Sequence, residues 1–273
     1  MAGSLLSLFT AVLFYFGWAS TDAETKALGL RDTVFRLSTS DYLLRSVDAL
    51  FLPAWLGTAA AFAAMGVHRL VRRGAPGTAR MLRLGRHAWV AAFLVLPLYP
   101  LTPTTFDLAI PLLTITGFLF TAYARTRPAD MTAAGAPSVR AHHVRVWALA
   151  LLISVLSLFW AVSTYAGIVG RGRAEQTART VRTGLPAVVV FSEKDLLIRG
   201  GGSCRFRVPI KDSAYGYRYA GLRLFHIAGD RVFVVPREWS PQQGTLFELE
   251  QSEFLRIEYV SGGNEQTDEC SSG

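Results

Sequence analysis

One carboxylate stands inside the apolar part of this sequence and is the first candidate for chemistry. Asp107 lies in a stretch from Ala88 to Ala124 that holds no other charged side chain. An acid in such surroundings could carry a proton or bind an ion. Asp107 also follows Thr104 and Thr105, where a helix is expected to begin, so it could cap that helix and complement its dipole. The position near the helix start favours the cap.

The two cysteines, Cys204 and Cys270, are the second candidate, for a single disulfide. An even number of cysteines in an oxidising compartment permits one bond. Closing a loop of 66 residues would stabilise the fold by about 4 kcal/mol in the chain-entropy model. Cys270 lies in a low-complexity tail at residues 262–273, however, so two free thiols are an equal alternative.

The sequence motifs of the common enzyme classes are absent. No HExxH, CxxC, GxSxG, GxxxxGK or SxxK pattern occurs, and these patterns mark zinc, redox, hydrolase and nucleotide sites. His142 and His143 are adjacent, so on a helix they point about 100° apart and cannot share a metal as an i, i+4 pair could. We therefore expect no enzyme activity, no metal site and no cofactor.

The elements that would position these residues are predicted from the distribution of apolar side chains. Of the 273 residues 51% are apolar and 18% charged, whereas soluble domains have about 25% charged residues. The apolar residues gather in long tracts, and a helix needs about 20 of them to cross a bilayer. The last tract has no polar face, which a helix in water would need. We predict a membrane α-helical bundle with about five transmembrane helices, at residues 4–19, 49–68, 88–102, 106–123 and 146–169.

Two short segments between these predicted spans hold the positive charge of the chain. Residues 69–87 have six arginines and no acid, and residues 124–145 have a net charge of +3. Short basic loops stay in the cytoplasm, so an even number of spans separates the two segments. Nucleic-acid binding would need a basic face on a folded domain, so no nucleic-acid partner is expected, and contact with anionic lipid headgroups is a weaker role. The topology-determining residues are Arg69, Arg72, Arg73, Arg80, Arg83 and Arg86.

The same rule predicts the sides of the membrane. The N-terminus is expected in the cytoplasm, and residues 20–48 and 170–273 outside it, in a multi-pass protein of the cell membrane. Residues 1–19 are an alternative cleaved signal peptide, although they lack the basic start of one. Either way the orientation of the later spans is unchanged.

The C-terminal part of the chain shows a different pattern. After a transmembrane domain at residues 1–169 and a linker or helical stub at 170–184, seven short runs of β-branched and aromatic residues alternate with turn sequences. They predict an extracytoplasmic antiparallel barrel or sandwich at residues 185–261, followed by a disordered tail at 262–273. Aromatic side chains could line a ligand groove there, but core packing is favoured for Tyr215, Tyr217, Tyr219, Phe225, Phe233 and Trp239.

Two smaller patterns concern the helices. Ser38 and Asp41 have the spacing of a capping box, so a helix is expected to begin near residue 39, with a kink at Pro53. In the last predicted span, small residues recur in steps of three and four and could line a conduction path or pack against another helix. Packing is favoured, since these side chains supply no charge selectivity; they are Ala150, Ser154, Ser157, Ala161 and Thr164.

Three stretches resemble a family of multi-pass membrane proteins from actinobacteria: YFGW at 15–18, LSTSDYLLRSVDALF at 37–51 and YRYAGLRLFHIAGDRVFVVPREWSP at 217–241. The resemblance implies a location in the cell membrane and an actinobacterial origin, and it brings no catalytic residues. The basic residues agree, since 25 of 28 are arginine, as a GC-rich genome produces.

These observations favour a membrane protein that presents a β domain for binding, sensing or assembly at the cell envelope. The expected partners are the lipid bilayer and either an envelope protein or a second copy of the chain. An oligomeric transporter or channel is the alternative. The few spans and the absence of a repeat between the two halves weigh against it.

Overall fold

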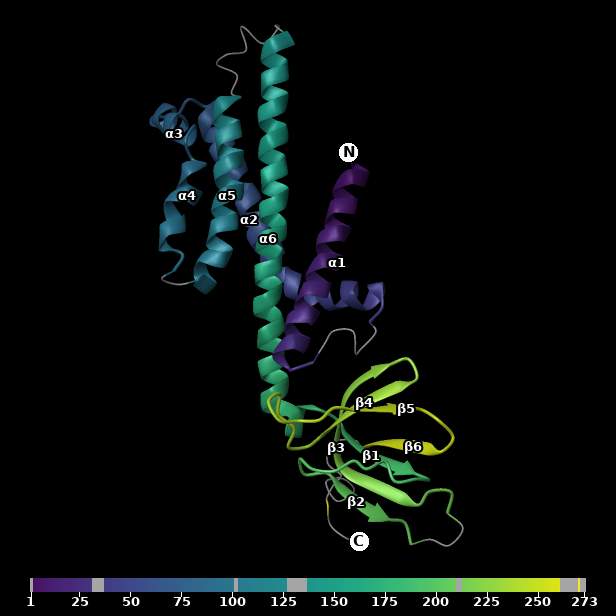
Figure 1. Ribbon diagram of the computed structural model, residues 1–273. Helices are drawn as coiled ribbons and strands as arrows, with labels where there is room; N and C mark the ends of the chain where they lie inside the picture. Colours follow the sequence, from purple (N-terminus) through teal and green to yellow (C-terminus); the bar gives the residue numbers. More distant parts are fainter. Residues whose placement is uncertain are drawn as a thin grey trace. The chain divides into compact units, whose positions relative to one another are not determined.

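The computed structural model describes residues 2–30, 37–100, 103–126, 137–209, 213–260 and 270. The chain divides into two compact units. The first unit comprises Met1–Ala19 and Tyr42–Gly167, and the second comprises Ser20–Asp41 and Ile168–Gly273. The first unit is helical, and the second combines helix ends with an antiparallel sheet (Figure 1).

Six α-helices and one 3-10 helix are found in the described residues. Three helical segments are long and apolar enough to cross a membrane: Ala49–Arg72, Thr105–Arg125 and Ala141–Gly184. They contain the predicted spans at 49–68, 106–123 and 146–169, and the predicted span at 4–19 lies within the first helix. The helices are α1 (Ala2–Ala27), α2 (Thr39–Arg72), α3 (Thr78–Gly85), α4 (Val90–Val95), η2 (Leu96–Leu98), α5 (Pro103–Arg125) and α6 (Pro137–Gly184).

The third predicted span, at residues 88–102, is not one continuous helix in the structure. Its described part consists of the six-residue α4 and the three-residue η2, which together rise only about 15 Å. The hydrocarbon core is about 30 Å thick. Pro97 lies within η2, and proline breaks the backbone hydrogen-bond ladder of a helix. The segment is therefore half as long as a spanning helix.

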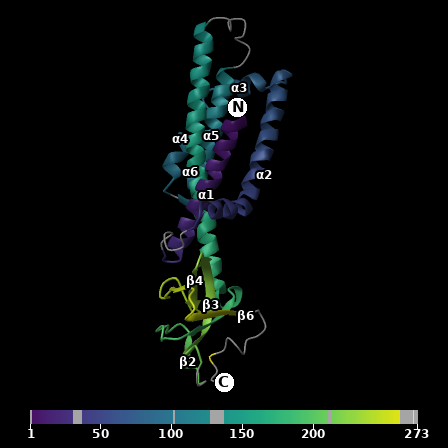
Figure 2. The ribbon, with the colours of Figure 1, turned by 90° about the vertical axis from the view of Figure 1, so that its right-hand side faces the viewer.

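The start of α2 has the predicted capping box. The Ser38 N–H donates to Asp41 Oδ2 over 2.8 Å, and the Asp41 N–H donates to Ser38 Oγ over 3.3 Å. These two bonds satisfy amide groups that the helix itself leaves free. Pro53 lies inside the same helix, and Figure 2 shows α2 running across one end of the bundle before it turns along it.

The small residues of the last predicted span pack against other helices. Their side chains are largely buried in the bundle, and Thr164 Oγ1 donates to the backbone oxygen of Asp107 on α5 over 3.4 Å. The Ser154 hydroxyl is buried and has no hydrogen-bond partner among the described residues. Close packing of α6 thus accounts for the spacing of Ala150, Ser154, Ser157 and Ala161.

The second unit contains one antiparallel sheet of six strands with the order β5-β4-β3-β1-β6. Strand β2 pairs with the first third of β3, at residues 217–220, while residues 222–228 pair with β4. The two ends of the order, β5 and β6, do not pair among the described strands, so these strands form no closed barrel, although five of them share one hydrophobic core. The strands are β1 (Ala187–Ser192), β2 (Cys204–Arg207), β3 (Tyr217–Ala228), β4 (Arg231–Pro236), β5 (Phe247–Glu250) and β6 (Leu255–Val260).

Six strands form where seven were predicted, because residues 195–198 are not a strand. The Leu197 N–H donates to Asp195 Oδ1 over 2.9 Å, and Leu197 has a φ of 56°. An aspartate side chain that bonds to the backbone two residues on makes a turn, and a positive φ is incompatible with a strand. Ile198 at the end of this turn nevertheless lies in the core.

The sheet is covered on both faces. Val232 and Val234 of β4 pack in one hydrophobic cluster with Val188 and Leu222, whereas Val235 packs in another with the helices. Successive residues of a strand point to opposite faces, which is why β4 is buried almost throughout.

The segment at residues 170–184, predicted as a linker or helical stub, is the end of α6 and belongs to the core of the second unit. Ala174 and Val181 of this helix pack with Val235 and Trp239. The chain after α1 joins the same cluster through Leu28. The predicted tail at 262–273 lies outside the described residues except for Cys270.

Candidate functional site

The two basic segments meet at one end of the first unit. The last turns of α2, the short α3 and the end of α5 pack together through Val71, Leu82 and Ala124. Thr121 Oγ1 on α5 donates to the Gly85 carbonyl oxygen over 3.2 Å. The beginning of α6 reaches the same place, because Trp147 Nε1 donates to Thr126 Oγ1 over 2.9 Å. Between the described parts of the basic stretches the chain forms α4, η2 and α5, and α4 and α5 lie side by side (Figure 1).

The arginines at this end carry positive charge without compensation. All six topology-determining arginines have exposed side chains, and so have Arg125 and Arg145. None of them forms an ion pair with an aspartate or glutamate in the described part of the chain. Such a surface attracts anions. We call this surface the basic end.

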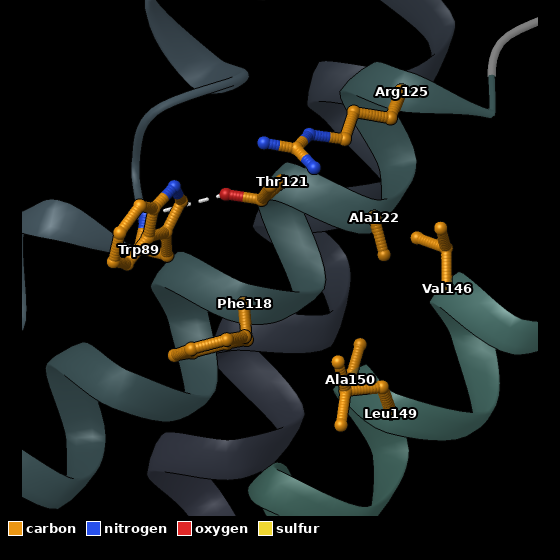
Figure 3. Close-up of a pocket in the computed structure, with 8 residues that line it drawn as sticks. All are labelled: Trp89, Phe118, Thr121, Ala122, Arg125, Val146, Leu149 and Ala150. Atoms are coloured by element: carbon orange, nitrogen blue, oxygen red, sulfur yellow. Dashed lines mark hydrogen bonds between the residues drawn. The ribbon is translucent and has the colours of Figure 1, made fainter.

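A pocket of about 300 Å³ opens beside the basic end. Its volume lies at the lower limit of small-molecule sites, which run from about 300 to 1,000 Å³. Figure 3 shows that α5 and α6 supply most of its wall, with Trp89 on the opposite side and Arg125 at one end. The lining residues are Trp89, Phe118, Thr121, Ala122, Arg125, Val146, Leu149 and Ala150.

Hydrogen bonds and glycines hold the wall of this pocket. The Trp89 N–H donates to Thr121 Oγ1 over 3.2 Å, which fixes the segment before α4 against α5. Gly117 allows this approach, because a Cβ there would lie 2.7 Å from the Ala88 carbonyl oxygen. Arg125 Nη2 lies 3.5 Å from the Arg86 carbonyl oxygen. The result is an apolar groove with one guanidinium at its mouth.

Asp107 has a different role from the predicted helix cap. Helix α5 begins at Pro103 and has no acidic residue in its first turn, so Asp107 lies too far along the helix to cap it. Its Oδ1 instead accepts a 2.9 Å hydrogen bond from the Tyr99 hydroxyl. This bond connects Tyr99, which directly follows η2, with α5.

The two cysteines are joined by a disulfide with a Cα–Cα distance of 5.5 Å. Cys270 Sγ lies 3.4 Å from the Gly202 carbonyl oxygen. Gly221 has a φ of 69°, and a Cβ there would collide with that same oxygen and lie 3.3 Å from the sulfur of Cys270. The bond therefore attaches the end of the chain where β3 and the turn before β2 approach most closely.

A polar network around the buried Tyr219 in the second unit was not predicted from the sequence. The Tyr219 hydroxyl donates to Asp195 Oδ1 over 2.6 Å and accepts from the Leu196 N–H over 2.7 Å. Asp195 also forms an ion pair with Arg205 on β2. Tyr219 has no exposed surface. The network fastens the turn at 195–198 to the sheet.

The network shifts two pKa values. Burial, together with the hydrogen bond to Asp195, raises the pKa of Tyr219 to about 12. The hydrogen bond from Tyr219, followed by that from the Leu197 N–H, lowers the pKa of Asp195. Two sequence signals could have located this network. They are the aspartate at the start of the strand-like run 195–198 and the alternating tyrosines at 215, 217 and 219.

The predicted core aromatics largely pack as expected. Tyr219, Phe233 and Trp239 are almost fully buried, and Tyr217 and Phe225 pack against the two hydrophobic clusters. Tyr215 contacts Phe191 with ring centroids 6.2 Å apart. These side chains therefore form core and edge contacts.

The side chains that commonly bind metals do not cluster in the residues that the structure describes. Those residues contain no group of three or more His, Cys, Asp or Glu side chains that could hold a metal ion. His142 and His143 lie side by side at the start of α6 with ring centroids 6.3 Å apart.

Comparison of the chain with protein-family models, curated proteins and solved structures finds no match.

Proposed function

We propose that this chain is a multi-pass protein of the cell membrane that presents its second unit outside the cytoplasm for binding, sensing or assembly. The N-terminus and the basic end lie in the cytoplasm. The protein belongs to the actinobacterial membrane family that its sequence resembles. Three apolar helices of spanning length and an uncompensated basic end support the membrane location and the orientation.

The construction of the second unit is the observation that carries this proposal. A folded sheet lies on the ends of two helices whose other parts are apolar, through Leu28, Ala174, Val181 and Trp239. A disulfide lies in the same unit, and disulfides persist in oxidising compartments.

The turn at residues 195–198 is the part of this unit best suited to recognition. Leu197 is 64% exposed and Phe254 is 58% exposed. The Glu193 N–H donates to the Phe254 carbonyl oxygen over 3.1 Å, so the two turns are neighbours. Leu197 is held at a positive φ by the network around Tyr219 and has an exposed side chain, and such backbone strain gathers at functional sites. The partner is an envelope protein or a second copy of this chain.

Site-specific crosslinking tests this function. A photoreactive amino acid is placed at Leu197 or Phe254 of the full-length protein in native membranes, with Glu175, which is also exposed, as the control position. We expect discrete crosslinked species from the first two positions and none from the third. Failure of both positions to crosslink, in protein that is folded and in the membrane, would refute a recognition role for this surface.

The alternative function, an oligomeric transporter or channel, would place the Ser154, Ser157 and Thr164 side chains along a polar path. They are instead packed in the bundle. Ion flux across liposomes that contain the purified protein separates the two functions, since the recognition module conducts no ions.

A further inference from the structure

We infer that the pocket beside the basic end binds one anionic phospholipid, with its phosphate at Arg125 and an acyl chain along the apolar wall. The inference rests on the membrane location proposed above and not on the partner of the second unit. It assigns the basic end a ligand as well as a part in topology.

The charge at the mouth of the pocket selects an anion. Arg125 is exposed and forms no ion pair with an acid in the described chain, and its Nη2 lies 3.5 Å from the carbonyl oxygen of Arg86. A single, long hydrogen bond leaves most of the five guanidinium N–H groups available. Guanidinium binds phosphate in a bidentate manner, and the neighbouring arginines raise the local concentration of anions.

The wall of the pocket selects an apolar chain. Phe118, Ala122, Leu149 and Ala150 present hydrocarbon, and Leu149 remains 57% exposed. The Thr121 hydroxyl is already engaged, accepting from the Trp89 N–H and donating to Gly85. The wall thus offers few polar groups to a soluble, hydrated ligand. Free phosphate would bind at Arg125 alone and would leave the apolar wall exposed to solvent.

The location suits a lipid. The pocket lies where α5 ends at Arg125 and where α6 enters its apolar part. On the proposed orientation this is the level of the inner-leaflet headgroups, where basic pockets between transmembrane helices bind anionic lipids. One guanidinium at the mouth and hydrocarbon below it correspond to the order of groups in a phospholipid.

Lipid binding to the full-length protein in a neutral detergent tests this inference. Native mass spectrometry would compare phosphatidylglycerol with phosphatidylcholine of the same acyl chains, and thermal stabilisation by inorganic phosphate would be measured in parallel. We expect preferential binding of phosphatidylglycerol that weakens as salt is added, and no comparable effect of inorganic phosphate.

Two variants and a matched control locate the site. Arg125→Gln is expected to weaken phosphatidylglycerol binding by about tenfold or more, since a charged hydrogen bond is lost. Leu149→Asn, at an exposed wall position, is expected to weaken it as well. Arg73→Gln removes a charge that is also exposed, at the same end but outside the pocket, and should change binding no more than about twofold.

Three results would overturn the inference. They are equal binding of the two lipids, an equal loss in the Arg125→Gln and Arg73→Gln proteins, or full stabilisation by inorganic phosphate alone. The last would assign the site to a soluble phosphate. Because this assay does not involve the second unit, its outcome is independent of the crosslinking result.

Discussion

Removal of the Cys204–Cys270 disulfide is expected to destabilise the second unit strongly. The bond closes a loop of 66 residues, and the chain-entropy model gives about 4 kcal/mol for a loop of that length. Single domains are stable by only about 5–15 kcal/mol, so the loss is a large part of the total. It corresponds to about a thousandfold fall in the ratio of folded to unfolded protein.

The assay is urea denaturation of the full-length Cys204→Ser, Cys270→Ser protein in detergent, with resistance of the second unit scored by pulsed proteolysis. The double variant should unfold at a clearly lower urea concentration than the wild type. Reductant should lower the wild-type midpoint to that of the variant and leave the variant unchanged. Equal midpoints for the two proteins, or alkylation of both wild-type cysteines before reduction, would refute the reasoning.

Three other changes act on the second unit. Tyr219→Phe leaves the partly buried N–H of Leu196 without its acceptor and removes the hydrogen bond to Asp195, so it should cost about 1–3 kcal/mol in a denaturant titration; an unchanged midpoint would contradict the network. Gly170→Leu places a side chain against the backbone of Ser20, so it should increase proteolysis at the junction of α1 and α6, whereas Gly172→Leu, which meets no atom, should not. The lowered pKa of Asp195 stabilises the fold above the ordinary carboxyl value of about 3.9. This stabilisation is lost as the pH falls through the folded-state pKa, so the acid sensitivity of unfolding should diminish in Asp195→Asn. The raised pKa of Tyr219, about 12, acts at the other extreme, where stability should fall as the pH rises from about 10 towards 12.

The elements that follow from local sequence were predictable. The capping box at Ser38 and Asp41 forms as its spacing requires, and long charge-free tracts become long helices. The buried small residues of α6 follow from their helical spacing. Each of these features depends on residues close to one another in the chain.

The features that were not predictable depend on distant contacts. Residues 195–198 have strand composition, but Tyr219 and Arg205 hold Asp195 in a turn. Composition also predicted a span at 88–102, where Pro97 instead divides a short helical segment. The pocket beside the basic end forms only when Trp89, α5 and α6 come together, so no single stretch of sequence contains it.

The end of α6 is another element whose role could not be predicted from local sequence. Residues 170–184 are polar and resemble a linker, yet Ala174 and Val181 lie on one face and are buried by Val235 and Trp239. Three apolar residues, Ala174, Ala178 and Val181, among many polar ones give a weak periodic signal. Ala174 and Val181 become core residues only because the sheet packs against them.

The most direct test of the central claim is the labelling of single cysteines in intact cells with a membrane-impermeant maleimide. In the protein without Cys204 and Cys270, new cysteines replace Gln242 in the second unit, Ala79 on α3 and Val144 on α6, all of which are exposed. We expect Gln242→Cys to be labelled in intact cells, and Ala79→Cys and Val144→Cys to react only after the membrane is permeabilised. Labelling of Ala79→Cys and Val144→Cys on opposite sides, or protection of Gln242→Cys, would contradict this claim.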